Sequence, residues 1–198
     1  MYIPPKWAFL VGGVLLTVIS AFVTGYVVSR RDTQRKKVEA RVTDTERQIT
    51  YRLERFSSSR SNSDFAQVLR SLIQRTCVPQ QFLHIQLTAI VARVVHSISD
   101  LYSAATGSSA SQQEVDTWTN LAGKAETGDS TAVEQLYAIQ EQFESQFQTQ
   151  NNSLVKERDE LRGTKVAIEL ETEKTKYIGL SFQIFGLVIV LLKDLFYG

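Results

Sequence analysis

The chain has 198 residues, a formal net charge of +1 and a single cysteine, Cys77. The near-neutral charge gives no basis for a nucleic-acid partner or an acidic substrate. One cysteine excludes an intrachain disulfide, which suits a reducing compartment. Only three prolines are present, and the sequence lacks alternating strand patterns and hairpin turn signals. We therefore expect an all-α protein.

The first predicted element is an apolar segment near the start of the chain. Residues 7–29 contain no charged side chain, and a helix of about 20 mostly apolar residues suffices to cross a membrane. Arg30 and Arg31 follow it, without the small-residue pattern of a signal-peptide cleavage site. The pattern predicts an uncleaved transmembrane helix over residues 1–29.

A basic helix is expected next, over residues 30–56. This segment has no proline or glycine, and its apolar residues fall on one helical stripe: Val38, Val42, Ile49, Leu53 and Phe56. We interpret it as a stalk that continues the first span. The serine-rich stretch 57–63 then predicts a loop, because serine and asparagine favour turns and helix N-caps.

Residues 57–130 are expected to form a helical bundle. The pattern predicts helices over 64–75, from Pro79 to about 105, and over 112–124, with a loop at 106–111 and a turn at Gly128. The middle helix is the most apolar of the three. Its charged and histidine residues (His84, Arg93, His96 and Asp100) argue against a third span. We interpret this helix as the buried centre of a bundle or as a subunit interface.

A long coiled-coil-like helix is predicted over residues 131–176. Apolar residues recur every seven positions, at Phe147, Leu154, Leu161 and Ile168, while the partner heptad positions are polar. This is half of a coiled-coil seam. The helix runs into a second apolar segment, residues 177–198, which is uncharged as far as Leu192. This segment can span a membrane if Lys193 and Asp194 lie at the far interface.

The flanking charges predict the topology. Arginine and lysine cluster on the inner side of both apolar segments, and positive residues close to spans stay cytoplasmic. We therefore expect an integral two-pass protein with a cytoplasmic central domain and both termini on the opposite face. The location would be a bacterial inner membrane or its equivalent, with membrane lipid as a partner.

The two predicted stalks carry opposite net charge. The first is basic and the second acidic, and both begin at the same face of the membrane. Two sets of residues then lie at matching distances from the spans: Arg35, Lys36 and Lys37 on one stalk, and Glu169, Glu171 and Glu173 on the other. We expect antiparallel pairing in which these charges set the register, since exposed ion pairs contribute only about 0–1 kcal/mol each.

Small and hydroxyl residues mark one face of each predicted span. They are Gly13, Thr17, Ser20, Ala21, Thr24 and Gly25 in the first span, and Gly179, Gln183 and Gly186 in the second. Small residues allow close helix packing, and hydroxyl groups can bond across the contact. The alternative is a weakly polar pore lining in an oligomer.

The sequence contains no recognisable catalytic, cofactor-binding or metal-binding motif. We expect a non-enzymatic membrane protein with no cofactor. It would act as a homo-oligomeric scaffold, anchor or signal-relay component, with a protein partner bound through the cytoplasmic domain. The alternatives are an oligomeric pore or channel, and a non-catalytic membrane subunit of a larger complex.

Overall fold

The computed structural model describes residues 5–75 and 80–197, and the side chains of these residues except 73–84 and 197. Every regular element in this part of the chain is helical, which confirms the predicted all-α class. Cys77 and Pro79 lie outside the described residues. The elements are α1 (Lys6–Phe22), the π-helix η1 (Val23–Val28), α2 (Ser29–Arg75), α3 (Gln80–Thr106), α4 (Gln112–Glu126) and α5 (Ser130–Tyr197).

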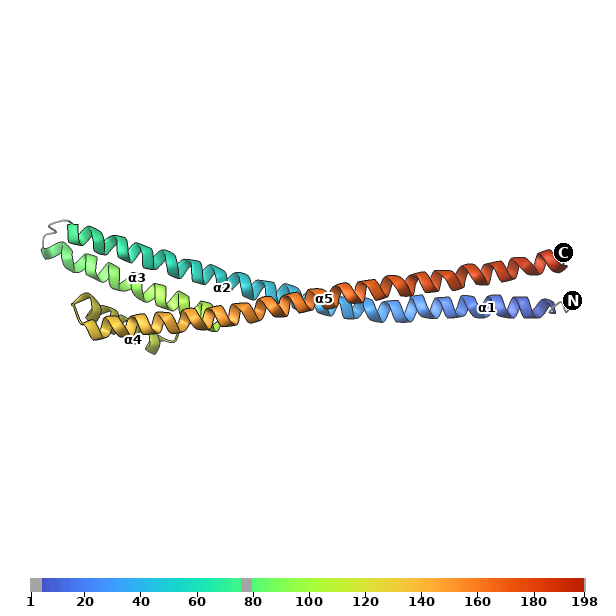
Figure 1. Cartoon of the computed structure of the whole chain (residues 1–198), viewed down its shortest axis with the longest axis horizontal. Coiled ribbons are helices and arrows are strands. Elements are labelled where there is room, and N and C mark those ends of the chain that lie inside the picture. Colours follow the sequence, from blue (N-terminus) through green and yellow to red (C-terminus); the bar gives the residue numbers. More distant parts are fainter. Residues whose placement is uncertain (1–4, 76–79, 198) are drawn as a thin grey trace. The chain divides into compact units, whose positions relative to one another are not determined.

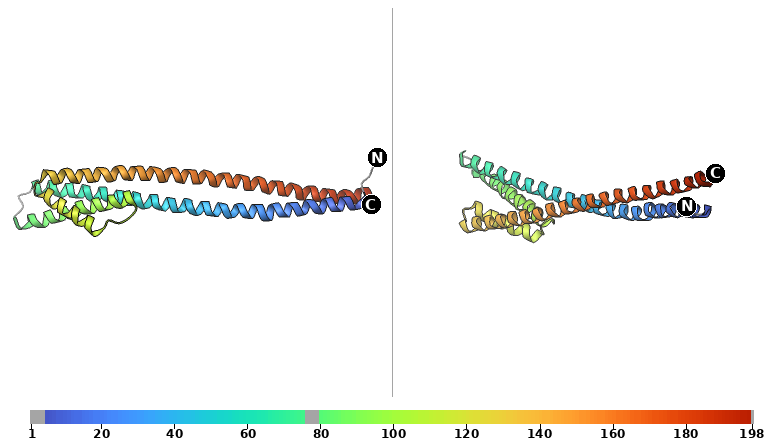
Figure 2. Two further views of the ribbon diagram at one scale, coloured as in Figure 1. Left: turned by 90° about the horizontal axis from the view of Figure 1, so that it is seen from below. Right: turned by 45° about the vertical axis from the view of Figure 1, so that its right-hand side comes forward.

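The chain divides into two compact units. Unit 1 comprises Met1–Thr43 and Asp159–Gly198, and unit 2 comprises Asp44–Arg158. Within unit 1, α1, η1 and the start of α2 lie beside the last part of α5. These two helical segments run in opposite directions (Figures 1 and 2). Both predicted apolar segments therefore belong to the same unit.

Unit 2 is built around a core to which four helical segments contribute. Its buried residues come from α2 (Ala66), α3 (Ile90, Val94, Val95, Ile98), α4 (Trp118, Ala122) and α5 (Leu136). Tyr102 and Phe143 extend the core. The Tyr102 ring is tilted relative to the Trp118 ring, and the Phe143 ring lies edge-on to it. Ile90 and Ile98 are fully buried. The apolar residues of α3 from Ile90 to Ile98 are thus covered by protein within unit 2, whereas Ile85 is 67% exposed.

A smaller cluster in the same unit surrounds the C-terminal end of α3. Ala104 and Ala105 are buried against Phe56 and Phe147, whose rings stack with centroids 4.4 Å apart. The Arg52 side chain is buried beside them, and its Nη1 donates to the carbonyl oxygens of Ala104 (2.8 Å) and Ala105 (2.7 Å). This guanidinium satisfies carbonyls that the helix leaves without an internal partner.

The position of Arg52 departs from the apolar stripe of the predicted stalk. Leu53, which belongs to that stripe, is 47% exposed. Its neighbour Arg52 occupies the buried position instead, because the C-terminal carbonyls of α3 need a donor there.

The predicted loop over residues 57–63 is wrong, because α2 continues through it as a helix. Its polar side chains bond to α3 rather than to their own backbone. Ser58 donates to Asp100 Oδ2 at 2.6 Å, Asn62 donates to the same oxygen at 3.3 Å, and Ser97 donates to the Ser59 carbonyl at 2.9 Å. These contacts with α3 override the local preference of serine for turns.

The predicted loop and turn elsewhere in unit 2 are confirmed. Residues 107–111 are non-helical, with Gly107 at φ +79°, and Gly128 adopts φ +96° between α4 and α5. These positive φ values favour glycine. Ser111 is the N-cap of α4 and forms a capping box, in which the Glu114 amide donates to the serine hydroxyl and Glu114 Oε2 accepts from the Ser111 amide at 2.7 Å.

Candidate functional site

The candidate site is the close pair of apolar helical segments in unit 1. Among the described residues, two helices are long and apolar enough to cross a membrane, and only 11% of the apolar window of each is buried. The outward side chains are large and exposed, including Leu10, Val14, Val18, Phe22, Ile184, Phe185, Leu187 and Leu191. The core helix of a soluble protein is mostly buried, so this exposure is the pattern expected of a surface that faces lipid.

Glycine allows the two segments to approach at van der Waals distance. A Cβ atom added to Gly13 would lie 2.5 Å from Val190 Cγ2 and 3.0 Å from the Gly186 carbonyl oxygen. A Cβ atom on Gly186 would lie 3.0 Å from the Gly13 carbonyl oxygen. The two helix backbones are therefore in direct contact at Gly13 and Gly186. Only glycine permits this contact without a shift of one helix.

A polar contact lies nearer the basic end of the same seam. The buried Ser20 hydroxyl donates to the Gly179 carbonyl oxygen at 2.7 Å. A Cβ atom on Gly179 would lie 2.6 Å from Thr24 Cγ2. The hydroxyls of Thr17 and Thr24 donate within their own helix, to the carbonyls of Gly13 and Ser20 at 2.9 and 2.8 Å. Every hydroxyl in this face thus has a partner without water, as a low-dielectric environment requires.

Three of the small or polar residues singled out in the sequence lie outside this seam. Ala21, Gly25 and Gln183 are exposed, and a Cβ atom on Gly25 would meet nothing within 4 Å. The seam instead follows Gly13, Ser20 and Val28, the buried residues of α1 and η1. Within one chain, the four-residue spacing of Ala21 and Gly25 therefore does not mark the contact face.

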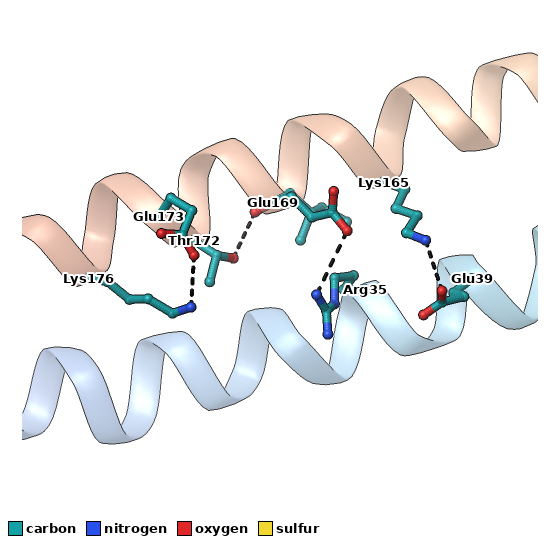
Figure 3. Close-up of polar contacts among 8 residues, drawn as sticks. Arg35, Glu39, Lys165, Glu169, Thr172, Glu173 and Lys176 are labelled. Carbon is teal, nitrogen blue, oxygen red and sulfur yellow. Dashed lines mark hydrogen bonds and ion pairs between the residues drawn. The ribbon is translucent and has the colours of Figure 1, made fainter.

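A ladder of charges continues the seam beyond the apolar segments (Figure 3). Arg35 Nη1 lies 3.8 Å from Glu169 Oε1, and Lys165 Nζ lies 2.8 Å from Glu39 Oε1. The two pairs have opposite polarity: the cation is on α2 in the first and on α5 in the second. The Lys165 ammonium lowers the pKa of the Glu39 carboxyl, chiefly through this hydrogen bond.

Glu39 and Lys165 were not predicted from the sequence, and neither was Arg31, which also belongs to this ladder. Arg31 Nη2 lies 3.3 Å from Glu171 Oε2, and Arg31 Nη1 donates to the Glu171 carbonyl oxygen at 2.6 Å and to the Thr175 hydroxyl. The signal was available, because Arg31 precedes Arg35 by one helical turn. Glu173 pairs within α5, with Lys176 at 2.8 Å, and Lys36 and Lys37 are exposed. Of the predicted cross-helix set, the structure brings together Arg35 with Glu169.

Aromatic side chains lie at both ends of the apolar pair. Tyr26 and Tyr177 are each two residues beyond the Thr24–Gly179 contact, and both are exposed. At the other end, Phe9 stacks on Phe196 with ring centroids 6.4 Å apart, and Trp7 is exposed nearby. Tyrosine and tryptophan favour the two interfaces of a bilayer.

The spacing of these aromatic residues matches a bilayer. Trp7 and Tyr26 are 19 residues apart. At about 1.5 Å per residue, this interval is about 29 Å long, close to the hydrocarbon thickness of about 30 Å.

Unit 2 contains a separate cavity of ≈ 340 Å³. Its wall includes an ion pair between Arg70 and Glu126, in which the Arg70 Nε donates to Glu126 Oε1 at 2.9 Å. Apolar residues of four helices, among them Ala66, Val94, Ala125 and Leu136, line the rest. This cavity cannot be predicted from local sequence patterns, because its lining comes from residues far apart in the chain.

Among the described residues, no group of three or more histidine, cysteine, aspartate or glutamate side chains is placed to hold a metal ion. No family model, curated protein or solved structure matches the chain.

Proposed function

We propose that this chain is a non-enzymatic, two-pass integral membrane protein that anchors a helical domain to the cytoplasmic face of a membrane. The pair of apolar segments would cross the bilayer, the charged ladder would form a two-helix stalk, and unit 2 would be the cytoplasmic bundle. Its role would be that of a scaffold or a signal relay. The topology follows from the arginine and lysine residues on the inner side of both segments.

The observation that carries this proposal is the contrast between the two faces of the apolar pair. The inner face is closed by Gly13 against Gly186 and by the Ser20 hydroxyl against the Gly179 carbonyl. The outer face consists of exposed large apolar side chains. A pair that satisfies its polar groups inside and presents hydrocarbon outside suits a lipid environment.

Extraction of native membranes tests the membrane insertion. A two-pass protein should stay in the pellet after alkaline carbonate treatment and enter solution only with detergent, because alkaline treatment disrupts peripheral contacts and leaves spanning helices in the bilayer. A peripheral protein would be released by carbonate. Release of the full-length chain would reject the anchor and the pore alike.

A pore or channel formed by several copies is the second candidate. Thr17, Ser20 and Thr24 would have to line it, yet all three hydroxyls already donate to carbonyls within one chain. This arrangement favours packing over a pore. Conductance of the purified protein in planar bilayers, lost on Thr17→Leu while the oligomer mass is retained, would favour the pore.

A homo-oligomer and a place in a larger complex remain part of the proposal. The outward Ala21 and Gly25 provide small residues at which a second copy can approach. Native mass measurement in detergent separates the cases. A mass that is a multiple of the chain mass supports a homo-oligomer, and a stable co-purifying protein of different mass supports a complex subunit.

A further inference from the structure

Charges next to the apolar pair are divided between two faces of unit 1. On the inner face, the carboxylates of Glu39, Glu169 and Glu171 pair with Lys165, Arg35 and Arg31. On α5, Glu173 pairs with Lys176. Asp32 also acts on Lys176, since its charge contributes to the raised pKa of that ammonium, after the larger effects of the Glu173 hydrogen bond and charge. Glu39, Glu169, Glu171 and Glu173 are thus each paired with a cation.

Four cations in this region have no such partner. Within the described part of the chain, Arg30, Lys36, Lys37 and Lys174 are exposed and take part in no ion pair. With 3.6 residues per turn, each lies about 120–140° around its helix from the seam. The outward faces of the stalk therefore carry an excess of positive charge.

The depth of Arg30 relative to the apolar pair suits lipid headgroups, and Lys36 and Lys37 lie farther along the stalk. Arg30 is four residues beyond Tyr26, about 6 Å along the helix, and Lys36 and Lys37 are about 15–17 Å beyond it. A headgroup layer is about 5–8 Å thick on each side of the hydrocarbon. Arg30 falls within it, and flexible lysine side chains can extend back toward it.

Helix direction strengthens this placement for α2. Side chains of a helix tilt toward its N-terminus. The N-terminus of α2 continues through η1 into the apolar segment, so Arg30, Lys36 and Lys37 tilt toward the membrane. Lys174 on α5 tilts away from the membrane, because α5 enters the apolar segment at its C-terminal part. The three cations of α2 are therefore the principal contacts.

We propose that Arg30, Lys36 and Lys37 form a binding surface for anionic phospholipid headgroups on the cytoplasmic leaflet. The surface would hold lipids with net negative charge in preference to zwitterionic lipids around the base of the stalk. It rests on the proposed membrane insertion, which it deepens by naming the lipid class. A cation close to an anionic membrane surface is attracted to that surface. The carboxylates of the inner face pair with other cations, so the positive charges of these three residues are not neutralised by them.

The test uses the full-length chain reconstituted in vesicles of equal parts phosphatidylglycerol and phosphatidylcholine with the same acyl chains. The protein is extracted in mild detergent, and the lipids that remain bound are counted by native mass spectrometry. We expect phosphatidylglycerol to be enriched over its share in the vesicle. The double variant Lys36→Gln/Lys37→Gln should lower the ratio of bound phosphatidylglycerol to bound phosphatidylcholine by at least about fivefold, which is the effect expected for one cation at an anionic surface.

A matched control removes the same charge from unit 2. Arg47 and Lys124 are exposed residues of that unit, and Arg47→Gln/Lys124→Gln should leave the enrichment unchanged. Raising the ionic strength from about 0.01 to about 1 M, which shortens the Debye length from about 30 to about 3 Å, should weaken it. Free inorganic phosphate should not displace the bound lipid.

Two outcomes overturn the inference. Equal retention of both lipids by the wild-type chain is one, and an equal loss of enrichment in both double variants is the other. Neither affects the membrane proposal, which fails separately if the reconstituted chain does not float with the vesicles on a density gradient.

Discussion

The Ser20 hydroxyl donates a 2.7 Å hydrogen bond to the carbonyl oxygen of Gly179, on the opposite helix of unit 1. Removing this donor should weaken the helix pair, because the hydroxyl is buried and its loss leaves the Gly179 carbonyl without this partner. For Ser20→Ala we expect a loss of about 0.6–1.7 kcal/mol in the free energy of unfolding in detergent. Ser181→Ala is the control, since the exposed Ser181 hydroxyl bonds only within its own helix. Equal effects of the two substitutions would count against the contact.

Glycine substitutions test the close approach of the same two helices. Gly13→Ala and Gly186→Ala place a Cβ atom about 3 Å from the opposite backbone oxygen, which cannot move without shifting the helix. Overpacking of this kind costs about 1–3 kcal/mol. Gly25→Ala should not destabilise the pair, because its Cβ atom would meet nothing within 4 Å. Thermal unfolding of unit 1 in detergent measures the difference, and a loss at Gly25 as large as that at Gly13 would place the seam elsewhere.

The pH dependence of the stalk should reflect Glu39. Lys165 lowers the pKa of this carboxyl below its ordinary value of 4.5. The Glu39 carboxylate therefore contributes its full stabilisation at pH values above its ordinary pKa. This stabilisation is lost as the pH falls through the lowered pKa. We expect the unfolding midpoint of unit 1 to fall on acidification below about pH 4.5, and to fall less in Glu39→Gln. Identical pH profiles for the variant and the wild type would exclude a role for this pair.

Arg52 and Gly107 test the end of α3 in unit 2. Arg52→Ala leaves the carbonyls of Ala104 and Ala105 without their buried donor, a loss of about 1.5–3 kcal/mol. Gly107→Ala combines a strained φ of +79° with a Cβ atom 3.0 Å from Arg52 Nη2. Gly128→Ala shares the positive φ but has open space, so it isolates the backbone strain. Chemical denaturation should rank Gly107→Ala as more destabilising than Gly128→Ala, and the reverse order would contradict the contact.

Local patterns in the sequence predicted the helical class, both apolar segments, the loop before Ser111 and the turn at Gly128, because each depends on residues close together in the chain. The loop predicted at residues 57–63 failed because its serines bond to Ser97 and Asp100 of α3, some 40 residues away. Arg52, which lies outside the apolar stripe, is buried for the same kind of reason. Such contacts cannot be found from local propensity.

The seam in unit 1 shows the same limit at finer scale. The small residues of the first apolar segment occupy a wide face, and only a partner helix decides that Gly13 and Ser20 are buried while Ala21 and Gly25 are exposed. The register of the two helices of unit 1 was closer to the prediction. Opposite charges at matching distances from the apolar segments favour one alignment of these helices. Arg35 with Glu169 is one such pair, and Arg31 with Glu171 extends it.

The measurement that tests the two-pass topology most directly is the location of three reporters in intact membranes. One is inserted at Ser109, in the exposed loop before α4, and the others are fused before Met1 and after Gly198. The account predicts that the Ser109 reporter is cytoplasmic and that both terminal reporters lie on the opposite face, because the arginines and lysines next to both segments stay on the cytoplasmic side. A C-terminal reporter on the same face as Ser109 would contradict the two-pass topology.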